Sequence, residues 1–81
     1  MSKKKNTYFD KPEFKNILAK YEGMVQNHTS IYFDAEDLVD IADYYISINN
    51  EERAEKAIDY SLILHPTDTD SLIYKIRSLS Y

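Results

Sequence analysis

The sequence predicts an all-α protein of about four antiparallel helices. The 81 residues include one glycine and two prolines, too few turn-forming residues for a β fold. In four segments, apolar residues recur at spacings of three and four, which is the period of one face of a helix. The segments between them are two to about seven residues long, and such short connections make successive helices antiparallel. The length allows one domain at most.

The composition excludes several classes of protein. No cysteine is present, so neither disulfides nor thiolate metal sites can form. A chain with 43% hydrophobic and 30% charged residues is typical of a folded domain. Its net charge of −4 argues against nucleic acid as a partner, because phosphate binding requires a positive surface. No apolar stretch reaches transmembrane length, so we expect no membrane partner and a cytoplasmic location.

The first eight residues contain a basic run, Lys3 to Lys5, without an apolar pattern. Such a run favours a disordered, solvated tail over residues 1–8. A single helical domain is expected over residues 9–81.

A first, flanking helix is predicted over residues 11–27. Asp10 is a suitable N-cap, Glu13 follows three residues later as in a capping box, and Pro12 falls in the first turn. Phe9 and Phe14 occupy the positions of a hydrophobic staple.

The apolar stripe of this helix comprises Phe14, Ile17, Leu18, Tyr21, Met24 and Val25. Gly23 interrupts it and weakens the helix by roughly 1 kcal/mol relative to alanine. The helix should end near Gln26 or Asn27, where a polar loop begins.

The second helix should begin after Asp34, which has Asp37 three residues later and a Phe33–Leu38 staple. Its apolar stripe comprises Leu38, Ile41, Ala42, Tyr45, Ile46 and Ile48. The acidic residues of its opening turn are expected there for structural reasons, because a helix N-terminus favours negative charge.

Asn49 or Asn50 is predicted to cap a third helix, which ends at His65 because a residue before proline disfavours the helical region. Its stripe comprises Ala54, Ala57, Ile58, Ser61, Leu62 and Leu64. Thr67 or Asp68 should cap a fourth helix, with an apolar face of Leu72, Ile73, Ile76 and Leu79.

The second and third helices contain the most specific pattern in the chain. Eight residues occupy the positions that define a 34-residue helical repeat: Leu38, Ile41, Ala42, Tyr45, Ala54, Ile58, Ser61 and Pro66. Residues 34–67 therefore resemble a tetratricopeptide repeat along their whole length, although Leu38 replaces the usual tryptophan and Ser61 a usual alanine. The small Ala42 and Ala54 allow the two helices to approach closely where they cross.

The resemblance implies a right-handed superhelical solenoid. Residues 68–81 are similar to the start of a further repeat, with Lys75 and Ile76 departing from the pattern. The opening from Tyr32 to Leu38 resembles N-terminal repeat segments of Bacteroides-type bacterial proteins. Because stable arrays usually need three or more repeats, either the flanking helices close the core, or the chain continues or self-associates. We expect it to be the N-terminal part of a longer array.

In this family the first helix of each unit lines a concave groove that binds another protein. The resemblance implies partner-binding positions at Glu36, Val39, Asp43, Ile46, Ile73 and Arg77, with Asp70 beside them. Family members that grip acidic C-terminal tails use a lysine and asparagines at such places, whereas this sequence has Val39 and Asp43, so that activity is not expected. An acidic and apolar groove would suit a basic or amphipathic segment of a partner. The alternative is that these are ordinary solvated helix residues.

Two further functions stay open: self-association through the C-terminal helix, and an accessory N-terminal domain of a longer regulatory protein. No enzyme, metal or cofactor is expected. His28 and His65 lie at helix ends without a second histidine four residues away, and no nucleophile motif or phosphate-binding glycine loop is present. Of the eight tyrosines, Tyr21 and Tyr45 are predicted in the core. Tyr44, Tyr60 and Tyr74 should cover seams between helices, the alternative being an interface.

Overall fold

The computed structural model describes residues 8–79, with side chains for residues 8–77. Within this range the regular structure is helical and contains no strand, so the predicted all-α class is confirmed. Two compact units are present, Met1–Ile31 and Tyr32–Tyr81. The predicted basic tail lies outside the described residues, apart from Tyr8.

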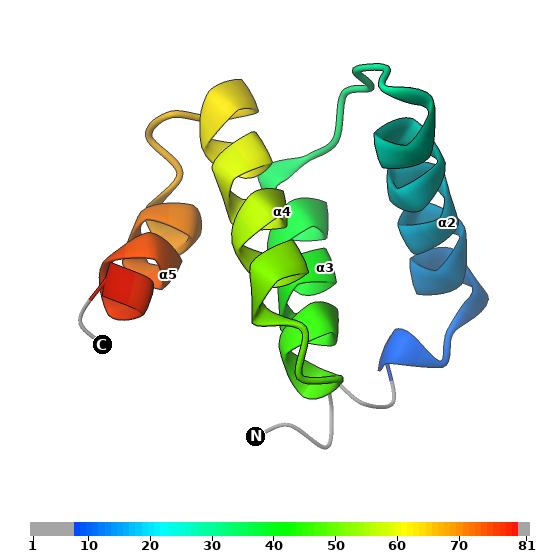
Figure 1. Ribbon diagram of the computed structural model, residues 1–81, viewed down its shortest axis with the longest axis horizontal. Helices are drawn as coiled ribbons and strands as arrows, with labels where there is room; N and C mark the ends of the chain where they lie inside the picture. The colour runs from blue at the N-terminus through cyan, green and yellow to red at the C-terminus, as the bar shows by residue number, and fades with distance from the viewer. Residues whose placement is uncertain (1–7, 80–81) are drawn as a thin grey trace. The chain divides into compact units, whose positions relative to one another are not determined.

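The first unit contains helix α2 (Pro12–Asn27) (Figure 1). Its N-cap is Lys11 and no side chain caps it, so the predicted cap at Asp10 is wrong. Lys11 is extended, with φ −75° and ψ 144°, because the proline ring that follows disfavours helical geometry at the preceding residue. The helix therefore starts at the proline, one residue later than a cap at Asp10 would require.

Three aromatic rings cluster at the start of α2. The Phe9 and Phe14 ring centroids lie 5.0 Å apart, and the Tyr8 centroid lies 5.4 Å from that of Phe14. The predicted Phe9–Phe14 contact is thus confirmed. Tyr21 and Met24 are also buried, whereas Val25 is 51% exposed. The prediction for Val25 was wrong although this residue lies within about 20° of the buried Phe14 around the helix; Val25 is in the last turn of α2.

Helix α2 ends at Asn27, as predicted. His28 adopts the left-handed conformation, with φ 56°, and the Thr29 amide donates to the Met24 carbonyl at 3.1 Å. A left-handed residue at this position reverses the direction of the chain, and this lets a following amide donate a hydrogen bond to one of the last helix carbonyls.

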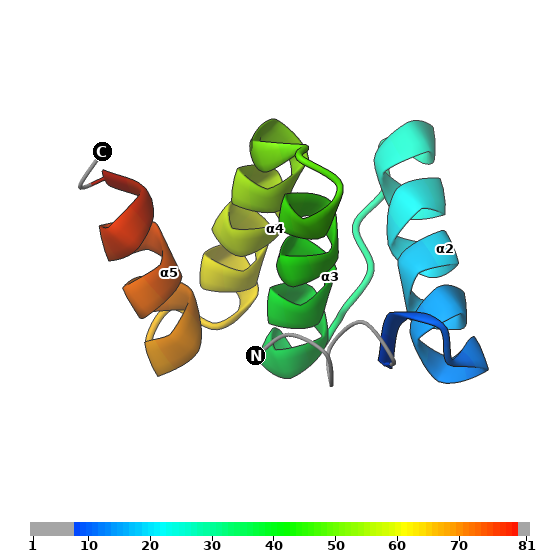
Figure 2. The same ribbon diagram turned by 90° about the horizontal axis from the view of Figure 1, so that it is seen from below.

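The second unit is built on an antiparallel hairpin of α3 (Ala35–Ser47) and α4 (Glu51–Leu64) (Figure 2). Ala42 and Ala54 are both buried, which fits a crossing where small side chains let the helices approach. The hydrophobic residues buried along the two helices are Leu38, Ile41, Ala42, Tyr45, Ala54, Ala57 and Ile58. The Arg53 guanidinium lies 5.8 Å from the centroid of the Tyr45 ring and adds a cation–π contact at one end.

One of the two helices of the hairpin has a side-chain N-cap. The Asn50 side chain accepts a hydrogen bond from the Arg53 amide at 3.2 Å, which confirms Asn50 as the cap of α4. Asn49 has φ 63°, a conformation that asparagine tolerates better than most residues. Asp34 precedes α3 as predicted but makes no capping bond; its carboxylate accepts the Tyr32 hydroxyl at 3.3 Å.

Helix α5 (Thr69–Leu79) packs against α4 and also contacts α3. Its cap is Asp68, whose carboxylate accepts the Ser71 amide at 2.9 Å, so the second of the two predicted caps is correct. In the connection before it, His65 Nε2 lies 2.8 Å from the Phe33 carbonyl oxygen. This contact links the loop between α4 and α5 to the segment that leads into α3.

Candidate protein-binding face

Two neighbouring helices of the second unit present the residues that the sequence marks for partner binding. We call this set the α3–α5 face: Glu36, Val39, Asp43 and Ile46 from α3, with Ile73 and Arg77 from α5. The four α3 residues are spaced by three, four and three, which puts them on one side of the helix. Because α3 and α5 are in contact, the structure brings the two parts of the set onto adjacent helices.

Isoleucines on this face are accessible to solvent. Ile46 and Ile73 are each 43% exposed, although the sequence also placed both in apolar stripes. Val39 and Asp43 are half-buried, and Glu36 is exposed. Ile48, another predicted stripe residue, is 51% exposed because it follows the last residue of α3 and caps the helix.

The charge of Asp43 on α3 acts on a tyrosine of α5. Burial, with further contributions from the negative charges of Asp43 and Glu51, raises the pKa of the Tyr74 phenol to about 12. The Tyr74 hydroxyl is buried and has no hydrogen-bond partner among the described residues. Asp43 therefore lies close enough to α5 to act on a side chain next to Ile73.

The second unit is strongly acidic. Residues 32–81 contain eleven acidic and four basic side chains, a net charge of −7, whereas the whole chain has −4. Glu36 and Asp43 contribute to this charge on the α3–α5 face, and Arg77 is its one basic member. A surface of this sign attracts basic partners and repels phosphate.

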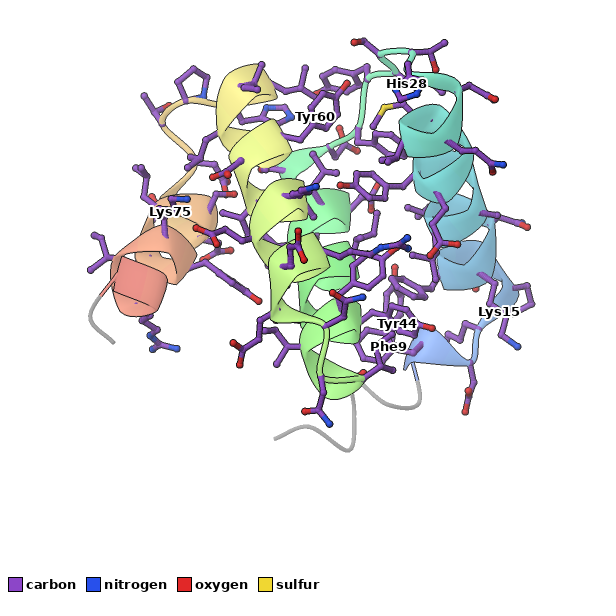
Figure 3. The ribbon with its side chains drawn as sticks, in the orientation of Figure 1. Phe9, Lys15, His28, Tyr44, Tyr60 and Lys75 are labelled. Atoms are coloured by element: carbon purple, nitrogen blue, oxygen red, sulfur yellow. The ribbon has the colours of Figure 1, made fainter. Side chains whose placement is uncertain are left out.

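Lys75 holds α5 against α4. Its ammonium group lies 2.8 Å from carboxylate oxygens of both Glu55 and Asp59, and Figure 3 shows Lys75 on the α5 segment beside α4. Hydrogen bonds to Asp59 and Glu55 raise the pKa of Lys75 above its usual value. The departure from the repeat pattern at Lys75 thus has a structural use, because the side chain pairs across helices at a position that is apolar in α3.

A buried polar chain adds a second connection between α4 and α5. The Ser61 and Ser71 hydroxyl oxygens lie 2.7 Å apart, and both residues are fully buried. The Ser71 hydroxyl also donates to the Asp68 carboxylate at 2.9 Å. Sequence reasoning missed this contact, because a serine in an apolar stripe gives no indication of which distant hydroxyl it meets.

The tyrosines differ in how deeply they are buried. Tyr21 and Tyr45 are 5% and 1% exposed, which confirms their prediction as core residues. Tyr44, Tyr60 and Tyr74 are half-buried, and their role in covering seams stays a prediction; Tyr44 and Tyr60 are labelled in Figure 3. The Tyr44 ring packs edge-on against Tyr45, with 5.4 Å between centroids.

Other sites were sought in the described part of the chain. No group of three or more metal-binding side chains is close enough to hold an ion there. None of the helices in that part has the length and apolar character needed to cross a membrane. His28 and His65 lie at the ends of α2 and α4, as predicted.

Comparison with protein-family models, with curated proteins and with solved structures finds no match for this chain.

Proposed function

We propose that the chain binds another protein, and that the α3–α5 face holds a basic, amphipathic helix of that partner. The observation behind this proposal is the exposure of Ile46 and Ile73 on adjacent helices of an acidic unit. Exposed isoleucines supply area that is removed from water on binding, at about 25 cal/mol per Å². Glu36 and Asp43 would select a partner with lysine or arginine beside its apolar stripe.

In the same proposal, residues 34–67 form one tetratricopeptide-type repeat and α5 begins another. Support comes from the α3–α4 hairpin with buried Ala42 and Ala54 at its crossing, and from the contact of α5 with both earlier helices. In such a stack of repeats, the first helix of each repeat contributes to the face that binds the partner. Partner and chain would meet in the cytoplasm, where the sequence predicts this protein to reside.

Binding is proposed rather than catalysis, because three acidic side chains that could act as an acid or a base form hydrogen bonds or ion pairs within the fold. Asp68 caps α5, and Glu55 with Asp59 binds Lys75. A general acid or base would need a titratable group placed beside a site for a substrate. Nucleic acid is a poor candidate, because a net charge of −7 on residues 32–81 opposes contact with phosphates.

The test uses a defined probe, a fluorescein-labelled basic amphipathic helix, with an acidic helix of the same apolar pattern as its control. Fluorescence anisotropy at low salt should show saturable binding of the basic helix. The acidic helix should bind at least tenfold more weakly. Affinity should also fall as salt rises, because Glu36 is exposed and Asp43 is only half-buried.

A matched pair of double variants locates the binding. Asp43→Lys with Ile46→Asp changes the α3–α5 face, and should weaken binding about tenfold or more because it removes an apolar anchor and reverses a charge. Glu52→Lys with Ile63→Asp makes the same chemical changes at exposed α4 residues, and should leave affinity unchanged. Equal affinity of both variants and the natural chain would refute the proposed face, provided that far-ultraviolet circular dichroism shows each variant folded.

Capture of partners from the native extract extends the test. A protein that is retained by the natural chain and lost with the Asp43→Lys, Ile46→Asp variant would name the partner. Recovery of only the chain itself would count against partner binding and favour self-association.

A further inference from the structure

Helix α5 turns its polar side toward its own unit and its apolar side toward solvent. Ser71 and Lys75 bind residues of α4, and the Tyr74 hydroxyl is buried beside them on the helix. Leu72, Ile73 and Ile76 are 41%, 43% and 65% exposed. This is the reverse of the usual arrangement, in which a surface helix buries its apolar stripe.

The exposed apolar side has a pattern that suits an identical helix running in the opposite direction. Leu72 and Ile76 are one turn apart, with their midpoint at position 74. Asp70 and Arg77 are two turns apart on the Ile73 edge of this stripe, with their midpoint at position 73.5. The two midpoints differ by about 0.75 Å along the helix axis, so one two-fold axis serves both pairs.

In an antiparallel pair about that axis, Leu72 of each copy meets Ile76 of the other, and Asp70 meets Arg77. A parallel pair would instead place the two Asp70 side chains, and the two Arg77 side chains, on opposite edges of the contact, where neither meets an opposite charge. The charges therefore select the antiparallel direction, and the contact is isologous and closes on two copies.

We propose that a second copy of this chain covers the outer side of α5, through an antiparallel α5–α5 contact built on Leu72, Ile73 and Ile76 with two Asp70–Arg77 pairs along one edge. This interface goes beyond the partner-binding face, with which it shares Ile73 and Arg77. One helix of 11 residues forms a small interface, in the class of weak and transient contacts. We expect a dimer that forms at concentrations on the order of 100 µM.

Sedimentation equilibrium of the 81-residue chain measures this association. The weight-average mass should rise from 9.5 kDa toward twice that value as concentration increases from about 10 µM to about 1 mM. Ile76→Asp should keep the chain monomeric over this range, because it places a charge in the centre of the contact. Ile63→Asp, at a residue of α4 that is 72% exposed, makes the same change outside the contact and should dimerise normally.

A charge exchange distinguishes the antiparallel pair from other modes of association. Asp70→Arg places arginine against Arg77 in both pairs and should raise the dimer dissociation constant about tenfold at low salt. The double variant Asp70→Arg with Arg77→Asp restores opposite charges, and should return the constant to within about threefold of the natural value. Circular dichroism should show equal helix content in all variants.

Three outcomes would overturn the proposal. The natural chain could remain monomeric up to about 1 mM; Ile63→Asp could abolish association as fully as Ile76→Asp; or the double charge exchange could fail to restore it. Each outcome is separate from peptide binding at Asp43 and Ile46, so failure of one proposal leaves the other intact.

Discussion

The contact between Ser61 and Ser71 predicts an unequal effect of two similar mutations. Ser71 donates its hydroxyl proton to Asp68 at 2.9 Å, and a hydroxyl has one proton to donate. Ser61 must therefore be the donor in the 2.7 Å contact with Ser71. Both side chains are fully buried, so water cannot replace a partner that is lost.

The expected costs follow from what each mutation leaves behind. Ser61→Ala removes one neutral hydrogen bond while Ser71 keeps its bond to Asp68, so unfolding should become easier by about 1 kcal/mol. Ser71→Ala removes the acceptor of a buried hydroxyl and a bond to a carboxylate, so we expect a loss of about 2–3 kcal/mol. In the double variant no serine hydroxyl is left without a partner, and the combined loss should be about 1 kcal/mol less than additive.

Urea denaturation followed by circular dichroism at 222 nm measures all four free energies of unfolding. The slopes of the transitions should agree, which shows that stability has changed and not the extent of unfolding. If Ser61→Ala proves as costly as Ser71→Ala, or if the two losses add within about 0.3 kcal/mol, the assigned direction of the hydrogen bonds is wrong.

Two further mutations test the local chemistry of each unit. Gly23→Ala should stabilise the chain by about 0.5–1 kcal/mol in urea denaturation, because alanine is the better helix former and an added Cβ meets no atom within 4 Å; a loss of stability would contradict this. Tyr74→Phe should be neutral or stabilising by about 1 kcal/mol at pH 7, since it removes a buried hydroxyl that has no partner. The natural chain should also lose stability as pH rises from about 10, where tyrosine ionises in the unfolded chain, to about 12, where Tyr74 ionises in the fold. Comparison of urea midpoints at pH 9 and 11 should show a smaller fall in Tyr74→Phe than in the natural chain, and equal falls would refute the assignment.

Helix positions were largely predictable because their causes are local. The cap residues Asn50 and Asp68 bond amides three residues later, and a sequence displays such pairs directly. The error at Asp10 has an equally local cause: Pro12 requires an extended Lys11, and this geometry outweighed the capping box. Asp34 shows the limit of the rule, because it stands at the N-cap position and makes no capping bond.

The candidate site was predictable only within one helix. The helical period alone places Glu36, Val39, Asp43 and Ile46 on one side of α3. That α5 lies beside them depends on contacts between residues far apart in the chain. Exposure was also beyond prediction, since Val25 and Ile48 satisfy the apolar spacing and are nevertheless about half exposed.

Taken alone, the sequence determined where the helices are and that each has an apolar and a polar side, because capping and periodicity act over three or four residues. The tertiary structure decided which side of α5 faces inward. Periodicity predicts that the side with Leu72 and Ile76 is buried. In the structure the polar side faces inward instead, because Ser71 forms a hydrogen bond with Ser61 and Lys75 pairs with two carboxylates on α4. Such partners offset the free-energy cost of burying polar groups. The contacts between them depend on the packing of α4 against α5, and no local sequence pattern specifies them.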